Sequence, residues 1–286
     1  MKNHFSKFTF SAYGWLGLSL IVVFWYLNWF LEELRTHWAF FPLWLGYCLT
    51  IDALVKTRSG SSLLTRSPIK YIGLFLISAP SWWLFELFNL HLNNWQYIGK
   101  EHFTDVEYAI LASLSFSTVI PAVFCSAELV TTFSWFKKLK FKFILTPNSK
   151  SLLIFFSVGI ILLVAILKWP DLFYPFVWVA VYFLIEPFNV KADHSSLFEF
   201  TKDKNWQALI SLSLGCLICA FFWEMWNYYS YPKWVYHLPH VNAPKLFEMP
   251  LPGYIGYIPF SFELFALTSL VYGIFRGRLT DYLKII

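Results

Sequence analysis

The run SLLIFFSVGIILLVAIL, from Ser151 to Leu167, carries no charged residue. Two serines are its only side chains that form ordinary hydrogen bonds, and Lys168 follows directly after it. A helix that crosses the hydrocarbon core of a bilayer needs about 20 mostly apolar residues. The stretch therefore predicts a transmembrane helix over 151–168, and it makes the whole chain a candidate membrane protein.

The composition of the 286-residue chain has the same apolar character. Hydrophobic residues make up 58% of it, aromatic residues 22% and charged residues only 14%, whereas a typical soluble domain has about 25% charged residues. These values exclude a soluble enzyme, a disordered protein and a secreted disulfide scaffold. The net charge of +5 does not indicate a nucleic-acid partner, because the charges are distributed between apolar runs.

Seven further runs are long and apolar enough to span a bilayer. They cover 11–31, 38–55, 71–90, 106–130, 172–190, 206–228 and 253–275. The sequence therefore predicts an all-α polytopic membrane protein with about eight transmembrane helices. The two weakest candidates, 38–55 and 172–190, each reach a carboxylate near the end, at Asp52 and Glu186.

The distribution of basic residues predicts the orientation in the membrane. Loops on the cytoplasmic side are enriched in Lys and Arg. With eight spans, 17 of the 22 basic residues fall on the side of the N-terminus, beginning with Lys2 and Lys7. The other five are Arg35, Lys100, Lys168, Lys233 and Lys245. We expect a multi-pass protein of the bacterial inner membrane with both termini in the cytoplasm.

The chain also contains an internal repeat. The segment from Trp44 to Asp52, followed by a Ser-Ser-Leu triplet, returns as Trp178 to Glu186 followed by the same triplet. Similarly, FELFN (85–89) and WQY (95–97) return as WEMWN (223–227) and WVY (234–236). Each half then holds four helices, over 1–142 and 143–286. Because four is even, both halves have the same orientation, which predicts a pseudo-two-fold axis along the membrane normal.

Carboxylates within the predicted spans are the main candidates for chemistry, because ionisable groups at membrane depth are costly and usually functional. No Lys or Arg interrupts a predicted span. The candidates are Glu263, the deepest, then Glu224, Glu86 and Glu128. Asn89 and Asn227 follow two of them at i,i+3, on the same helix face, where an amide can orient a carboxyl group. Convergence of Glu86, Glu224, Glu128 and Glu263 on one cavity would favour an enzyme.

Simpler interpretations compete with these. Asp52 and Glu186 lie at helix ends, where they can sit among headgroups. Trp and Tyr commonly form interfacial belts, although the recurrence of Trp95 and Tyr97 as Trp234 and Tyr236 favours a ligand-binding role.

Histidines and cysteines offer weaker signals for a metal. The loop histidines are His91, His102, His237 and His240, and zinc needs three or four converging ligands. The four cysteines, Cys48, Cys125, Cys216 and Cys219, lie within apolar runs, where cysteine usually acts as a small hydrophobe. We expect no metal site.

The order of these residues resembles the integral-membrane lycopene cyclases of the heterodimeric bacterial and fused fungal type. In that family a helix ends in an acid, a short loop carries Trp, and a segment with Pro and Glu follows among aromatic residues. The matching residues here are Glu224 or Asn227, then WVY (234–236) and PFSFELF (259–265). The first half offers Glu86 or Asn89, WQY (95–97), Pro121 and Glu128. The chain also looks like other bacterial polytopic membrane proteins.

The resemblance implies a membrane-embedded enzyme that cyclises or isomerises an apolar, carotenoid-like isoprenoid without a cofactor. Glu263 would protonate a double bond, Glu224 and Asn227 would steer the proton, and the aromatic faces of Trp234 and Tyr236 would stabilise the carbocation. Membrane lipid and an apolar small molecule are then the expected partners. A proton-coupled small-molecule transporter and a non-catalytic accessory subunit of a membrane complex are the alternatives.

Overall fold

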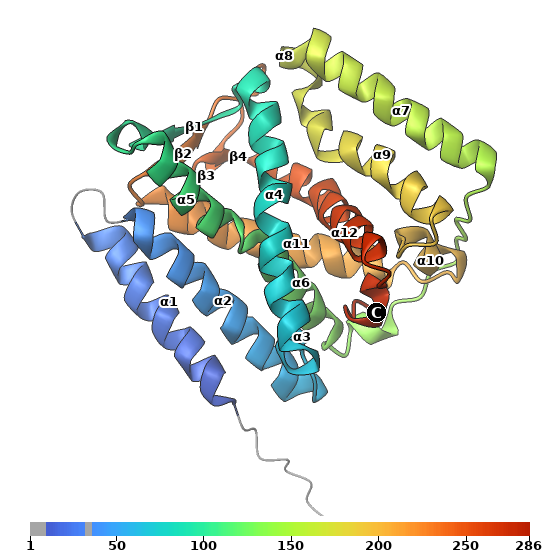
Figure 1. Ribbon diagram of the computed structural model, residues 1–286, viewed down its shortest axis with the longest axis horizontal. Coiled ribbons are helices and arrows are strands. Elements are labelled where there is room, and N and C mark those ends of the chain that lie inside the picture. Colours follow the sequence, from blue (N-terminus) through green and yellow to red (C-terminus); the bar gives the residue numbers. More distant parts are fainter. Residues whose placement is uncertain (1–9, 32–35) are drawn as a thin grey trace, which may run out of the picture.

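The computed structural model describes residues 10–31 and 36–286, and within these ranges the chain is an all-α polytopic membrane protein (Figure 1). Eight of its helical segments are long and apolar enough to cross a membrane. They overlap all eight spans predicted from the sequence. Lys2, Lys7 and Arg35, which contribute to the predicted orientation, lie outside the described residues.

The spans are formed by α1 (Ala12–Phe30), α2 (Thr36–Ser59), α4 (Pro68–Leu92), α5 (Asp105–Phe116) with α6 (Val119–Thr131), α7 (Ser149–Lys168), α8 (Pro170–Phe173) with η4 (Tyr174–Phe176) and α9 (Val177–Lys191), α11 (Gln207–Tyr228), and η5 (Leu251–Gly256) with α12 (Tyr257–Ile274). The short helices are α3 (Leu63–Arg66), η2 (Lys100–His102), η3 (Phe136–Lys138), α10 (Leu197–Lys202) and η6 (Leu279–Asp281). Two short strand pairs complete the fold: β1 (Trp95–Ile98) with β2 (Lys233–Tyr236), and β3 (Lys245–Leu246) with β4 (Met249–Pro250).

The fourth span is two helices rather than one. The chain breaks between α5 and α6 at Ser117 and Thr118. Ser78, from α4, stabilises the break by donating to the Phe116 carbonyl at 2.6 Å and accepting from the Ile120 amide at 3.0 Å. These bonds satisfy backbone groups that would otherwise lack partners at a helix end.

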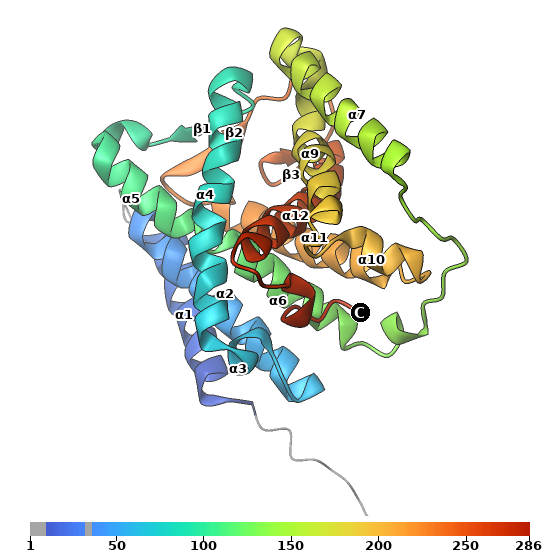
Figure 2. The same ribbon diagram turned by 45° about the vertical axis from the view of Figure 1, so that its right-hand side comes forward.

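The two ends of the helical bundle differ in content. The start of α1, α3, α10 and the C-terminus gather at one end, and the strands lie at the other (Figures 1 and 2). Tyr13 donates to Asp52 at 2.9 Å, and Arg66 donates to the Tyr282 carbonyl at 3.0 Å, which ties the first end together. The described C-terminus and the strands therefore lie at opposite ends of the bundle.

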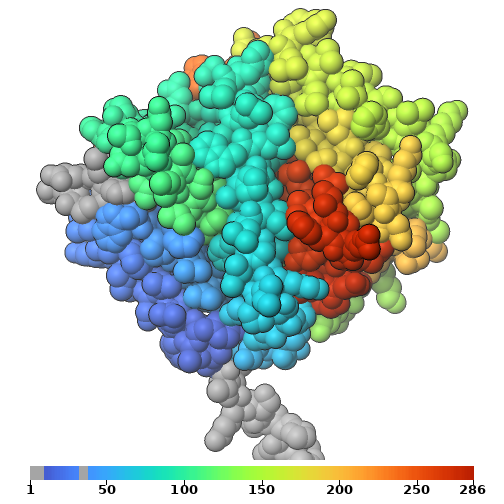
Figure 3. All heavy atoms as spheres, in the orientation of Figure 1, coloured from blue at the N-terminus to red at the C-terminus, as the bar shows by residue number. Residues whose placement is uncertain are grey.

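Positions matched in the two halves make matched contacts, and these contacts cross between the halves. Trp44 of α2 packs on Trp223 of α11, with ring centroids 5.1 Å apart. At the matching positions, Trp178 of α9 stacks on Phe85 of α4 at 5.2 Å. The halves therefore interlock. In the space-filling view α4 runs between helices of the first and second halves (Figure 3).

The core lies where α6 crosses α11. Eleven of the thirteen residues of α6 are buried, which identifies it as the central helix. Gly215 of α11 allows this approach, because a Cβ added there would lie 2.5 Å from the Ala127 amide nitrogen. The four cysteines are all free and buried, as expected for small hydrophobes.

Candidate functional site

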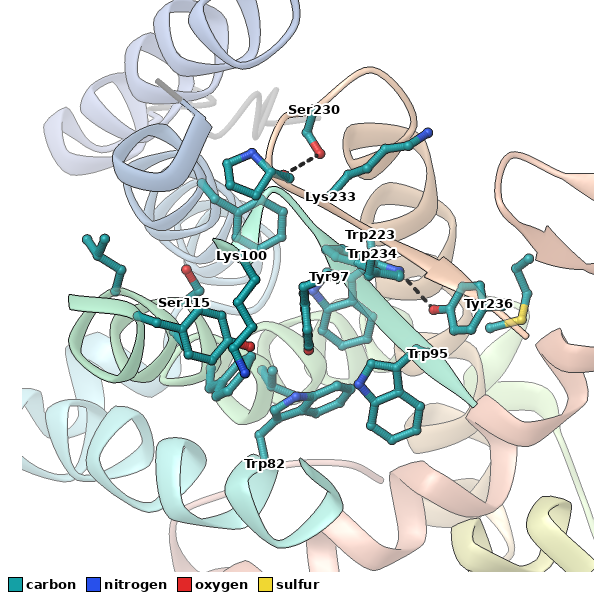
Figure 4. Close-up of a pocket in the computed structure, with 18 of the residues that line it drawn as sticks. Trp82, Trp95, Tyr97, Lys100, Ser115, Trp223, Ser230, Lys233, Trp234 and Tyr236 are labelled. Atoms are coloured by element: carbon teal, nitrogen blue, oxygen red, sulfur yellow. Dashed lines mark hydrogen bonds between the residues drawn. The ribbon is translucent and has the colours of Figure 1, made fainter. Parts of the chain in front are cut away.

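The recurring aromatic residues meet in the ribbon formed by β1 and β2. The strands are antiparallel, and Trp95 pairs with Tyr236 while Tyr97 pairs with Trp234. Each Trp thus faces the other half's Tyr. Because alternate residues of a strand share a face, all four rings lie on one side of the ribbon. Each of them lines the same cavity (Figure 4).

Two asparagines fix the ribbon to the helices below it. Asn89 donates to the Trp95 carbonyl at 2.8 Å and accepts from the Trp95 amide at 3.2 Å. Asn227 makes the same pair of bonds with Trp234, at 2.7 and 2.9 Å. The side-chain amide of each asparagine thus bonds both the N–H and the carbonyl of one strand residue, as a residue of a neighbouring strand would. These asparagines hold the backbone of the ribbon, whereas the sequence suggests that they orient the carboxyl groups.

Glu86 lies beside the first half's rings. A single oxygen, Oε1, accepts from the indole of Trp82 at 2.9 Å, the indole of Trp95 at 3.1 Å and the phenol of Tyr97 at 2.5 Å. An indole N–H can only donate a hydrogen bond, so Glu86 Oε1 is the acceptor in both indole contacts. The i,i+4 spacing of Trp82 and Glu86 on one helix face is a signal in the sequence for the first of these contacts.

Glu224 occupies the matching place in the second half. Its Oε1 accepts from Tyr236 at 2.7 Å and from Tyr257 at 2.8 Å, and the Trp234 indole donates to the Tyr236 oxygen at 2.9 Å. The other carboxyl oxygen is buried and has no hydrogen-bond partner within the described part of the chain. Tyr257 has no aromatic counterpart in the first half, so the repeat could not indicate it.

The cavity under the ribbon has a volume of about 190 Å³ and a mostly aromatic lining. Its walls include Trp82 of α4, Trp178 of α9, Trp223 of α11 and Phe260 of α12. Neither Glu86 nor Glu224 is among the lining residues, whereas the phenols bonded to them, on Tyr97, Tyr236 and Tyr257, are. A ligand would therefore meet phenols, each bonded to a carboxyl group behind it.

The phenols of the ribbon stay protonated over the ordinary pH range. Burial raises the pKa of Tyr97 well above its usual value, and the negative charge of Glu86 adds to the rise. Burial likewise raises the pKa of Tyr236, with Glu224 as the second cause. Each phenol is consequently a hydrogen-bond donor to its carboxyl group.

Glu128 lies far from this site, at the opposite end of the bundle. It forms an ion pair with Arg66 and accepts from the Lys284 amide at 2.7 Å. Although no Lys or Arg interrupts a predicted span, Glu128 has a cationic partner, because Arg66 lies between spans and reaches into the bundle. Asp52 and Glu186 share this end, where they accept from the Leu64 amide at 3.0 Å and the Leu197 amide at 2.6 Å.

Glu263 does not line the cavity either. It points to α9, where the Tyr182 amide donates to it at 3.4 Å. The Phe260 ring, one turn earlier on α12, lines the cavity in its place. The four candidate carboxylates therefore do not converge on this cavity. Only Glu86 and Glu224 lie next to it, through the phenols that line it.

The loop histidines are spread over separate contacts. The ring of His91 lies 3.1 Å from the Leu167 carbonyl, and that of His102 lies 3.2 Å from the Tyr231 hydroxyl. His237 and His240 are exposed. Among the residues that the structure describes, no three His, Cys, Asp or Glu side chains are grouped as metal ligands would be.

The fold and this site together define a polytopic membrane protein with an aromatic cavity at one end of its helices. No family model, no curated protein and no solved structure matches the chain.

Proposed function

We propose that the protein is a membrane enzyme that binds an apolar, isoprenoid-like lipid in the aromatic cavity and exchanges protons with it. The observation that carries this proposal is the pair of phenol–carboxyl contacts on one face of the ribbon, Tyr97 with Glu86 and Tyr236 with Glu224. Acid–base catalysis needs a proton donor or acceptor within hydrogen-bond reach of the substrate. The phenols meet that need at the cavity wall.

The chemistry follows from two such sites facing one ligand. A proton added to one carbon of a double bond leaves a carbocation at the other carbon. Loss of a proton from a neighbouring carbon forms a new double bond, so the overall reaction is an isomerisation or cyclisation without a redox change. In this scheme the carboxyl group at one site is protonated and passes its proton to the phenol in front of it, while that phenol gives its own proton to the double bond. At the other site the phenol takes up the proton lost by the substrate and passes its own proton to the carboxylate behind it.

The lining of the cavity suits a cationic intermediate. Trp82, Trp178 and Trp223 present aromatic faces, and an aromatic face stabilises a nearby cation by about 0.5–2 kcal/mol. The transporter alternative has less support, because Asp52 and Glu128 at the other end are held by fixed hydrogen bonds.

The test compares membrane lipid extracts from cells that express wild-type protein, no protein, or single variants. We expect Tyr236→Phe and Glu224→Gln each to lower the rate of the lipid conversion by about 100-fold or more. This is the effect of removing a general acid or base from an active site. Tyr254→Phe is the matched control, since this phenol bonds to the Leu246 carbonyl and does not line the cavity. A wild-type lipid profile in both site variants would overturn the acid–base role.

A further inference from the structure

Lys100 is a charged cavity residue to which the proposed chemistry gives no task. It follows β1 in η2, and its side chain lines the cavity. Figure 4 shows this side chain extending among the aromatic rings. The ammonium lies 4.4 Å from the centroid of the Tyr108 ring, which lines the same cavity. A positive charge is thus placed in the lining of a mostly aromatic site.

The neighbouring charges leave Lys100 available. Lys233 also lines the cavity, but it forms an ion pair with Glu248 and donates to the Tyr228 carbonyl at 3.3 Å. The nearest acid in sequence, Glu101, accepts from the Gly99 amide at 3.2 Å. Within residues 10–31 and 36–286, no carboxylate lies within ion-pair distance of the Lys100 ammonium. The charge of Lys100 is therefore not neutralised by any carboxylate in these ranges.

Helix α5 separates this cavity from a second apolar hollow. Leu111 and Ser115 face the cavity, whereas Ala109 and Ile110 line an open groove of about 990 Å³ between α2, α4 and α5. Only Phe116 of α5 is buried, so most of this helix is at least partly exposed. The apolar groove on the other face of α5 therefore lies next to the cavity, with this helix between the two.

We propose that the cavity binds a lipid with a phosphate headgroup, which pairs with Lys100 while the apolar chain lies among the rings. This inference rests on the proposed lipid site and narrows its ligand from a neutral hydrocarbon to an anionic amphiphile. The ammonium supplies the charge, and the Ser115 hydroxyl is a second polar group in the lining. Lys100 is a specificity residue in this scheme and takes no part in proton transfer.

The test measures binding to purified full-length protein in a non-ionic detergent by isothermal titration calorimetry. The probes are geranylgeranyl phosphate, geranylgeraniol and inorganic phosphate. We expect wild type to bind the phosphorylated lipid about ten- to hundredfold more tightly than the alcohol, as for a charge-assisted hydrogen bond. Lys100→Gln should remove this preference and Lys100→Arg should keep it. Lys140→Gln, an exposed lysine at the other end of the bundle, is the control and should leave it unchanged.

The outcomes separate the two proposals. Equal affinity of wild type for the phosphate and the alcohol would overturn the headgroup site and leave the apolar-lipid function standing. A preference that survives in Lys100→Gln would overturn the role of this residue. Tight binding of inorganic phosphate alone would make the site one for a free anion and would also contradict the inference. Failure of both lipids to bind would overturn the lipid cavity itself.

Discussion

Residues of one type have different roles in this molecule, and the surrounding donors decide which. Glu86 and Glu224 accept from aromatic side chains beside a cavity. Glu186 accepts from the amide that begins α10, and Glu128 pairs with Arg66. The sequence identifies all of them as unusual, because a carboxylate among apolar residues is costly. It cannot assign their roles, since the donors come from distant segments.

Asn227 provides a test at this scale. We expect Asn227→Ala to lower the stability of the protein by about 1–3 kcal/mol, because a buried side chain that bonds both the amide and the carbonyl of Trp234 is lost. Thermal unfolding in detergent, followed by circular dichroism, measures the change.

Asn89→Ala is the matched variant. Asn89 is partly exposed, so water can replace part of its hydrogen bonding to Trp95. The loss of stability in Asn89→Ala should therefore be smaller than in Asn227→Ala. An unchanged melting temperature for Asn227→Ala would contradict the anchoring role.

Secondary structure elements differ in how far the sequence reveals them. The spans are predictable because each is a long apolar run, and all eight are confirmed. The ribbon is not predictable, because four-residue strands such as β1 carry no periodic signal and their pairing depends on the other half. The break between α5 and α6 is equally hidden, since the hydrophobic run continues through it. Ser78, which supports the break, lies some forty residues away.

Helix packing at the centre of the bundle gives the second prediction. In Gly215→Ala the added methyl group would meet the backbone of Ala127 on α6, at 2.5 Å from its nitrogen. Backbone atoms cannot move aside without shifting a helix, so we expect a loss of about 1–3 kcal/mol.

Gly73→Ala on α4 is the control, since nothing lies within 4 Å of the position that its methyl group would take, and alanine is the better helix former by up to about 1 kcal/mol. The free energy of unfolding in mixed micelles measures both variants. Equal changes in the free energy of unfolding for the two variants would contradict the close approach of α6 to α11 at Gly215.

For the whole molecule, the sequence predicts the number of spans. It does not predict which carboxylates meet, because the partners of Glu263 and Glu128, the Tyr182 amide and Arg66, lie in distant segments of the chain. The boundary of the halves near residue 142 stays a prediction. The matched contacts of Trp44 and Trp178 are the arrangement that two related halves would produce.

Orientation in the membrane gives the third prediction. Gln96 is exposed on the ribbon and Lys140 is exposed at the other end of the bundle. With the excess of basic residues inside, Gln96→Cys should react with a membrane-impermeant maleimide in intact cells, and Lys140→Cys only after permeabilisation. The four native cysteines are buried, so the wild-type protein should remain unlabelled. Labelling of Lys140→Cys in intact cells would reverse the assigned topology.

The pairing of β1 with β2 has a consequence for how such a chain can arise. Each strand pairs with its own counterpart in the other half, in a register that matches Trp95 to Tyr236 and Tyr97 to Trp234. Such a contact is self-complementary, the kind that a two-fold symmetric homodimer uses. A shorter protein with one such strand per copy would form the same two-stranded ribbon by dimerising. Fusion of its two copies would then free each phenol–carboxyl pair to diverge, as Tyr257 has done beside Glu224 alone.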